Sequence, residues 1–260
     1  LLDSLVTFPN IGDTLSFLNS EQSNLSITSD ESINVPTNNK NLILKAAGII
    51  NSKYSRSILL KKILPIAAGI GGGSADAAAT IRDAISLGYK VSSQDIVKLG
   101  ADVLACLESQ PLRMTGIGDQ LKLINPWPRD GYIILVNPMV PLATKKVFAA
   151  LEQKNNRPMP PCLPLFSTFK ELVHFVKGHR NDLEDTAIKL EPIIQKVLFE
   201  IGKNKNCLIS RMSGSGPTCF GLFENYTKAY AAKLSLMKDF PNWWIISSEL
   251  TVKKSDLGPF

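Results

Sequence analysis

The alternation of apolar and polar residues predicts β-strands in the first part of the chain. Short alternations give strands at 3–8, 13–18 and 24–29, and a β-rich run gives another at 56–65. Apolar residues at helical spacing predict helices at 39–54, at 92–100 with a cap at Ser92 or Ser93, and from Ser74 to about Leu87, where Gly88 follows as a C-cap. Strands and helices therefore mix in this half.

The second part of the chain repeats this mixture after a segment rich in proline. Residues 124–131, INPWPRDG, carry two prolines and a glycine and are the best candidate for a domain boundary. Beyond it, strands are predicted at 132–138, 207–212, 218–223 and 243–250, and helices at 144–153, 227–240 and, with a kink or break at Pro192, 181–202. Because the two element types do not strictly alternate, the fold class is α+β. We expect one domain at 1–127 and a second at 128–260.

The segment PIAAGIGGGSADAAA, which begins at Pro65, joins a glycine-rich loop to a helix. Four glycines destabilise a fold unless the backbone needs their freedom, and the alanines that follow are strong helix formers. A helix N-terminus offers unpaired N–H groups and a partial positive charge, so this junction predicts a phosphate-binding site with Ser74 as N-cap. A simple glycine turn would need only one or two glycines.

The spacing of this loop separates it from several common nucleotide motifs. Gly73 stands where a Walker A loop has lysine, and Ser74 stands where a dinucleotide fingerprint has its third glycine. The segment instead resembles the signature of the GHMP small-molecule kinases. That resemblance implies ATP binding by eleven consecutive residues: Pro65, Ile66, Ala67, Ala68, Gly69, Ile70, Gly71, Gly72, Gly73, Ser74 and Ala75.

Two further segments extend the resemblance. RMSGSGPTCFGLF, at 211–223, reads alone as a hairpin turn, but it resembles the second GHMP loop, which implies that Ser213, Gly214, Ser215 and Gly216 close on the phosphates. Asp102 lies among apolar residues, so we expect it to be partly buried; alone it would be a helix cap or an ion-pair partner. The match of GADV to one GHMP branch implies that Asp102 is the catalytic base, although Leu104 replaces the usual proline.

The order of all these segments is similar to that of the 4-diphosphocytidyl-2-C-methyl-D-erythritol kinases, a GHMP branch. A T-x-x-x-F motif implies that Thr144 and Phe148 line a cytidine pocket, and NDLE at 181–184 completes the set. The resemblance implies an S5-like N-terminal domain, a ferredoxin-like C-terminal domain, and phosphorylation of the 2-hydroxyl of 4-diphosphocytidyl-2-C-methyl-D-erythritol by ATP with Mg²⁺, on the route to isoprenoids. Its metal ligands are not implied.

The family also has an N-terminal lysine-bearing strand and a cytosine-gripping segment, and this chain begins after both. Lys45, Lys61 and Lys62 stand in the wrong contexts to replace that lysine. We therefore expect a shortened chain that is poorly active or inactive. Two alternatives stay open: another GHMP kinase, acting on mevalonate or homoserine, and a non-catalytic nucleotide-binding relative.

Charge and composition change this picture little. The 260 residues carry a net charge of +6, but the lysines are scattered and no basic run with aromatics predicts nucleic-acid binding; we expect the charge to attract polyphosphate substrates. The four cysteines lack CxxC spacing, and His174 and His179 are expected at the surface, so neither disulfides nor a zinc site is predicted. No apolar run reaches membrane-spanning length. We expect a cytoplasmic monomer or homodimer whose partners are ATP and a cytidine-diphosphate sugar alcohol.

Overall fold

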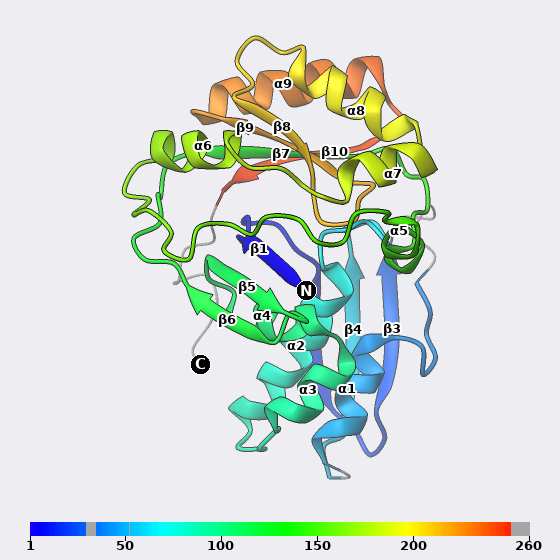
Figure 1. Ribbon diagram of the computed structural model, residues 1–260. Coiled ribbons are helices and arrows are strands. Elements are labelled where there is room, and N and C mark those ends of the chain that lie inside the picture. Colours follow the sequence, from blue (N-terminus) through cyan, green and yellow to red (C-terminus); the bar gives the residue numbers. More distant parts are fainter. Residues whose placement is uncertain (30–34, 52, 251–260) are drawn as a thin grey trace.

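The computed structural model describes residues 1–29, 35–51 and 53–250 (Figure 1). Two three-stranded sheets belong to the first half. In one, β5 (Leu112–Gly116) lies between β1 (Leu2–Val6) and β6 (Gln120–Leu123), all antiparallel. In the other, β4 (Arg56–Lys62) lies between β2 (Thr14–Asn19), which is antiparallel to it, and β3 (Asn24–Ser29), which is parallel.

Four helices pack between and below these sheets (Figure 1). They are α1 (Leu42–Ile50), α2 (Gly72–Ser86), α3 (Ser93–Leu99) and α4 (Ala101–Glu108). Their shared core is built from small and branched side chains, among them Ala46, Ala77, Ala78, Ile81 and Val103. Alanine brings helix axes close together because its side chain is short, so the alanine run after the glycines serves packing as well as helix formation.

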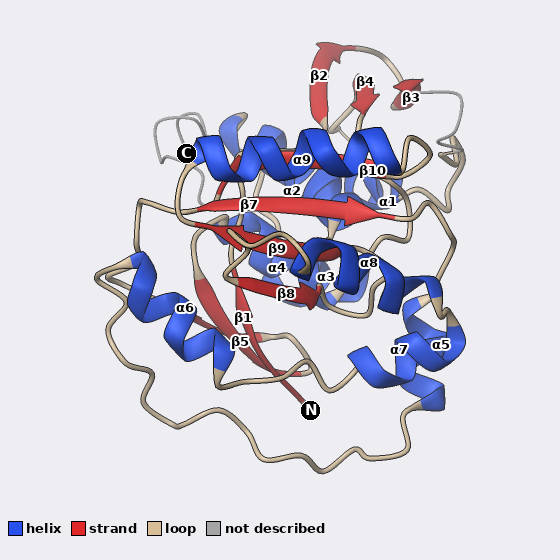
Figure 2. Ribbon diagram, turned by 90° about the horizontal axis from the view of Figure 1, so that it is seen from above, coloured by secondary structure: helices blue, strands red, loops and turns tan. Residues whose placement is uncertain are grey.

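The second half forms a four-stranded antiparallel sheet in the order β10–β7–β9–β8. Its strands are β7 (Tyr132–Asn137), β8 (Ile209–Met212), β9 (Cys219–Phe223) and β10 (Trp244–Glu249). Helices α8 (Ile193–Gly202) and α9 (Tyr226–Asp239) cover one face, as Figure 2 shows from above, and α6 (Phe169–Lys177) packs on the other. Helices α5 (Thr144–Ala150) and α7 (Glu184–Leu190) lie at one side (Figure 1).

The sheet order identifies the architecture of the second half. Counted along this half, the strands stand in the order fourth, first, third, second, with α8 and α9 as the crossover helices on one face. This is the β-α-β-β-α-β arrangement of ferredoxin-like domains, so the predicted α+β class and ferredoxin-like second domain are confirmed. Residues 124–131 join the two groups of strands; the division into domains at 127 and 128 stays a prediction.

One predicted helix cap, that of α2, is wrong. Helix α2 begins at Gly72, and its N-cap is Gly71 in the left-handed conformation at φ 68°, so Ser74 lies inside the first turn. Helix α5 takes Ala143 as its N-cap, which makes Thr144 its first residue and leaves the Thr144 hydroxyl free to bond elsewhere. In contrast, Ser92 caps α3 by accepting a hydrogen bond from the Asp95 N–H, as predicted.

Other differences follow from contacts that are distant in sequence. The helix at 181–202 is not one of them, because its predicted break at Pro192 is confirmed: α7 ends at Leu190, Glu191 follows in a non-helical conformation, and Pro192 precedes α8. The sequence did not predict β5, β6, α4 or α6. His174 on α6 is exposed as expected, but His179 is half-buried and stacks on Phe175 at a centroid distance of 4.0 Å. Within the described residues, no helix is both long and apolar enough to cross a bilayer.

Candidate active site

The glycine loop between β4 and α2 turns through three left-handed residues: Ala67, at φ 51°, and two glycines. Gly69 has φ 71° and Gly71 has φ 68°, a region that costs other L-residues about 1–2 kcal/mol. Helix α2 starts immediately afterwards, so its first N–H groups are presented by Gly72, Gly73 and Ser74. The loop is therefore a short backbone cradle at a helix N-terminus, where an anion is stabilised.

The second loop, residues 213–217, lies directly against the first. The Ser213 hydroxyl donates to the Gly69 carbonyl at 3.0 Å, and the Thr218 N–H donates to the Ala68 carbonyl at 3.2 Å. A Cβ atom on Gly69 would lie 2.6 Å from the Gly216 carbonyl oxygen and 2.8 Å from that of Ser213. The two loops approach so closely that a side chain at Gly69 has no space. The loop is also the turn of the β8–β9 hairpin, as the simpler interpretation predicted.

The NDLE segment holds the second loop in place. The Asn181 side-chain amide donates to the carbonyls of Met212, at 3.0 Å, and Gly214, at 2.8 Å. The Glu184 carboxylate accepts the Met212 N–H at 2.7 Å. These bonds fix both polar groups of Met212, at the point where β8 ends and the loop begins, so the segment positions the loop.

Hydroxyl contacts hold the other end of this loop. The Thr144 and Ser215 hydroxyls lie 2.8 Å apart, and the Asn137 side-chain amide donates to the Thr218 hydroxyl at 2.8 Å. Ser215, Thr218 and Asn137 are all buried. One turn after Thr144, the Phe148 ring is 41% exposed, so it offers an aromatic face to a ligand.

Asp102 is the second residue of α4; one side of it is exposed to solvent and the other is, as expected, partly buried. Protein atoms on its inner side withdraw water and raise the pKa of its carboxyl. One turn further along α4, the Cys106 sulfur lies 4.0 Å from the Gly71 carbonyl oxygen. The pKa of that thiol is raised to about 12, first by burial and then by the charge of Asp102. Helix α4 thus carries Asp102 beside the glycine loop.

A buried charge cluster lies beneath the loop. The Lys62 ammonium, 5% exposed, lies 2.5 Å from the Asp13 carboxylate and 2.9 Å from that of Asp76. The other Asp13 oxygen accepts the N–H groups of Ile63 and Leu64. Burial, more than the neighbouring Asp13 charge, raises the pKa of Asp76 to about 6, against the pull of Lys62. The cluster ties the end of β4 to the first turn of α2.

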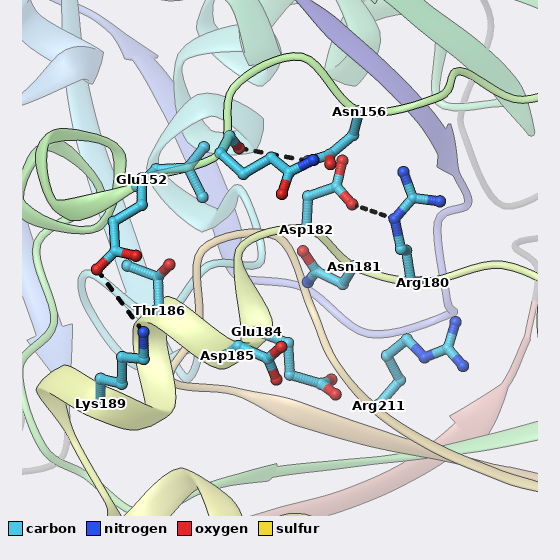
Figure 3. A pocket seen from close by; sticks show the side chains of 12 residues that line it. Glu152, Asn156, Arg180, Asn181, Asp182, Glu184, Asp185, Thr186, Lys189 and Arg211 are labelled. Atoms are coloured by element: carbon cyan, nitrogen blue, oxygen red, sulfur yellow. Dashed lines mark hydrogen bonds and ion pairs between the residues drawn. The ribbon is translucent and has the colours of Figure 1, made fainter.

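A cavity of about 330 Å³ opens beside the NDLE segment (Figure 3). It is lined by charges of both signs, and two ion pairs border it: Arg180 with Asp182, and Lys189 with Glu152. None of the glycine-loop residues lines it. The cavity therefore lies next to the second loop rather than between the two loops.

Comparison with known proteins identifies the family. The profile of the GHMP kinases N-terminal domain matches residues 41–122, and that of the GHMP kinases C-terminal domain matches residues 165–242. A 4-diphosphocytidyl-2-C-methyl-D-erythritol kinase of Cereibacter sphaeroides (strain ATCC 17025) is 43% identical over 94% of this chain and 88% of its own length. The chain belongs to this kinase family. A second member, from Dinoroseobacter shibae, is 43% identical over 96% of the chain and 86% of its own length.

Solved structures agree with this assignment to the 4-diphosphocytidyl-2-C-methyl-D-erythritol kinases. A crystal structure of such a kinase, named there 4-(cytidine 5'-diphospho)-2C-methyl-D-erythritol kinase, superposes with a TM-score of 0.66 at 26% identity, over 90% of this chain and 84% of that one. A homoserine kinase from Cytophaga hutchinsonii shares the fold, with a TM-score of 0.61 at 17% identity over 92% of this chain and 85% of that one. The expectation of a shortened, poorly active or inactive chain finds no support, because the alignments cover 86–88% of the relatives' length.

The structure brings most of the predicted site residues of this kinase family together. The two loops touch, Thr144 contacts the second loop, and Asp102 lies on a helix that packs against the first. Phe148 follows on the same helix as Thr144 but is not hydrogen-bonded to either loop. The sequence analysis noted the NDLE segment but did not predict that Asn181 and Glu184 hold the second loop through hydrogen bonds to its backbone. It also missed the Lys62 cluster, whose members are up to 63 positions apart.

The contact between the loops predicts the effect of Gly69→Ala. The added Cβ would meet backbone atoms of Gly216 and Ser213, which cannot rotate away as a flexible side chain can. We expect weaker ATP binding by at least tenfold and a loss of more than about 1–2 kcal/mol in the free energy of unfolding, from the left-handed backbone alone. Isothermal titration and urea unfolding measure both quantities.

Gly48→Ala is the matched control for this substitution. Gly48 lies in α1, where an added Cβ meets nothing within 4 Å, so helix propensity should stabilise the variant by about 0.5–1 kcal/mol. If Gly69→Ala bound ATP as tightly as Gly48→Ala does, the close contact of the loops would not govern the site.

The buried cluster predicts a large effect for Lys62→Met. Removing the ammonium leaves two carboxylates buried without their counter-charge, and such losses cost about 3–5 kcal/mol. Urea unfolding should show that loss, whereas Lys61→Met, at the exposed neighbouring position, should change stability by less than about 0.5 kcal/mol. Equal stabilities of the two variants would refute a structural role for the cluster.

Proposed function

We propose that this protein transfers the γ-phosphate of ATP to the 2-hydroxyl of 4-diphosphocytidyl-2-C-methyl-D-erythritol. The observation that carries the proposal is the direct contact between the two glycine-containing loops, with Asp102 on the helix that abuts the first of them. Relatives about 43% identical over nearly the whole chain bear the name of this kinase. We also propose a cytoplasmic location, and a monomer or a homodimer.

The glycine loop supports the ATP-binding half of this proposal. Three consecutive N–H groups at the start of α2, from Gly72 to Ser74, and the helix dipole favour the charge that develops on the transferred phosphate. The Lys62 ammonium adds little net attraction, because two carboxylates surround it. Backbone amides, rather than a lysine side chain, therefore provide the binding groups of this loop.

Asp102 supports the acid–base half. As general base it accepts the proton of the acceptor hydroxyl while that oxygen attacks the γ-phosphate, and the O–P bond to the leaving ADP breaks. Its exposed side chain is open to a substrate, and its raised pKa makes it a stronger base than an ordinary aspartate. Both properties suit proton removal from an alcohol.

The residues fit Mg²⁺ bound mainly through the nucleotide. Among the described residues, no group of three or more His, Cys, Asp or Glu side chains lies together as a metal cage. Magnesium keeps several waters and usually takes only one or two protein ligands in addition to substrate phosphates. The half-buried Ser74 hydroxyl in the first turn of α2 would be such a ligand. When bound, the ion neutralises phosphate charge.

Thr144 and Phe148 support recognition of the cytidine end of the acceptor. The Phe148 ring is 41% exposed on the same helix whose first residue contacts the second loop. Stacking of a base on an aromatic ring contributes about 1–3 kcal/mol. The exposure of this ring, on a helix that contacts the second loop, supports a role in binding the nucleoside.

An acceptor panel tests the function. Purified protein with ATP and Mg²⁺ should release ADP with 4-diphosphocytidyl-2-C-methyl-D-erythritol and should show at least a hundredfold lower kcat/KM with mevalonate or homoserine. Phosphorus NMR of the product should place the new phosphate on the 2-hydroxyl. Transfer to mevalonate or homoserine alone would end the proposal in favour of another GHMP kinase.

The role of Asp102 predicts a loss of rate in Asp102→Asn. A positioned general base contributes about 10²–10⁴ in rate, so kcat should fall by that factor while ATP affinity stays within threefold. Glu108→Gln, an exposed change at the far end of the same helix, should retain full kcat. Equal kcat values for the two variants would contradict the assignment.

The pH profile gives the same assignment an independent signature. The base must be deprotonated, and burial raises the pKa of Asp102 above its ordinary 3.8, so more of the enzyme is protonated at a given acidic pH. The acidic limb of kcat/KM should thus lie above pH 3.8. This limb should disappear in Asp102→Asn.

A further inference from the structure

A long proline-rich segment crosses between the two halves of the molecule. Residues 151–167, here called the strap, connect α5 to α6 and contain four prolines at 158, 160, 161 and 164. In Figure 1 the strap is the green loop that passes between the four-stranded sheet and β1. Proline fixes φ and removes the N–H group, so such a segment is stiff but has few hydrogen bonds of its own.

One arginine of the first half anchors the middle of the strap. The five N–H donors of Arg113 make five hydrogen bonds: two to the Asp3 carboxylate at 2.7 and 2.8 Å, and one each to the carbonyls of Met159, Pro160 and Pro161 at 2.8–3.2 Å. Asp3 in turn accepts the Met159 N–H at 2.8 Å. Asp3 and Arg113, 12–18% exposed, are here called the clamp.

The clamp binds the strap in addition to joining two strands. Arg113 lies on β5 and Asp3 on the neighbouring β1, where Leu5 is opposite Arg113. An ion pair between these strands needs only two of the five donors. The other three bind strap carbonyls, and only the planar guanidinium can direct all five at once. Elsewhere, residues 154–162 are mostly exposed, and Arg180 adds one bond to the Arg157 carbonyl.

Contacts already described connect the strap to the active site on one side. Its first residue follows α5, whose Thr144 hydroxyl lies 2.8 Å from that of Ser215 in the second loop. The cavity of Figure 3 lies at this beginning of the strap and contains Asn156 from it, beside Asn181, which holds the second loop. The strap therefore starts beside the segment that holds the second loop.

The clamp connects the strap to Asp102 on the other side. Strand β5, which carries Arg113, leads into a turn in which a Cβ atom on Gly118 would lie 2.5 Å from that of Ala101. Ala101 directly precedes Asp102 on α4, and Cys106 on α4 touches the glycine loop. A continuous series of contacts thus connects the two loops with α5, the strap, β5 and α4, and returns to the glycine loop.

We propose that the clamp positions the strap as the wall of the active site on the acceptor side, so that Asp3 and Arg113 set the affinity for the acceptor and not for ATP. This inference rests on the proposed function. The described strap residues make no hydrogen bond to the glycine loop, whereas the strap joins the helix of Thr144 and Phe148 to the strand beside α4. Asp3 and Arg113 are positioning residues.

Conservative variants of the clamp test the proposal. Arg113→Lys keeps the charge but loses the planar fork. Asp3→Asn loses the negative charge and one of the two oxygens that together accept three N–H groups, from Arg113 and Met159. In both we expect the KM for the acceptor to rise about tenfold, with kcat within twofold and the KM for ATP unchanged. Arg129→Lys, at an exposed position, is the matched control and should leave all three values unchanged.

Hydrogen exchange measured by mass spectrometry reports how firmly the strap is held, independently of enzyme activity. Exchange of the Met159 amide, in a peptide where three prolines contribute no N–H, should be at least tenfold faster in both clamp variants. In the wild-type protein, which raises no question of misfolding, saturating acceptor should slow exchange in residues 151–165, whereas ATP alone should not.

Each other outcome overturns the proposal. Unchanged exchange in both variants means that the clamp does not hold the strap. Faster exchange with an unchanged acceptor KM, or equal wild-type exchange with and without acceptor, means that the strap is not a wall of the site. A wild-type enzyme without activity on this acceptor refutes the proposed function itself, and this inference falls with it; the two failures are distinguished by wild-type turnover.

Discussion

The structure depends on the contact of two backbones that have no side chains between them. Gly69 and Gly216 come from segments about 150 positions apart, and a Cβ on the first would lie 2.6 Å from the carbonyl oxygen of the second. Because bonds from Ser213 and Thr218 close the same contact, the four-stranded sheet cannot move independently of the glycine loop. The relative position of the two halves is thus fixed at the point where phosphate is expected to bind.

The charges near this contact are arranged so that the backbone amides remain free. Lys62 is neutralised by Asp13 and Asp76 beneath the loop, and Asn181 and Glu184 use their polar groups on Met212 and Gly214. None of these side chains competes for the N–H groups at the start of α2. Glu184 is an acidic residue close to the second loop, but its carboxylate accepts the Met212 N–H and so holds that loop in position.

Periodicity predicted the elements whose stability is largely local. The strands β4 and β7 and the helices α2 and α9 show a clear apolar pattern, and the glycine loop between β4 and α2 was visible because glycine and alanine run together. The α+β class and the members of both loops followed from that pattern and from the family resemblance. One cap was predicted wrongly: Ser74 has the residue type of an N-cap, but the left-handed Gly71, three residues earlier, caps the helix.

What the sequence could not predict depends on partners far along the chain. Strand β5 contains a polar residue, Arg113, whose partners lie far away in the sequence. They are Asp3, 110 positions before it, and the strap, which begins nearly 40 positions after it. No local window contains these partners. The same distance explains why the polar residues of β5 do not destabilise the fold: all five donors of the guanidinium are bonded, so its partial burial leaves no donor unpaired. A polar residue inside a strand is therefore a signal of a long-range contact.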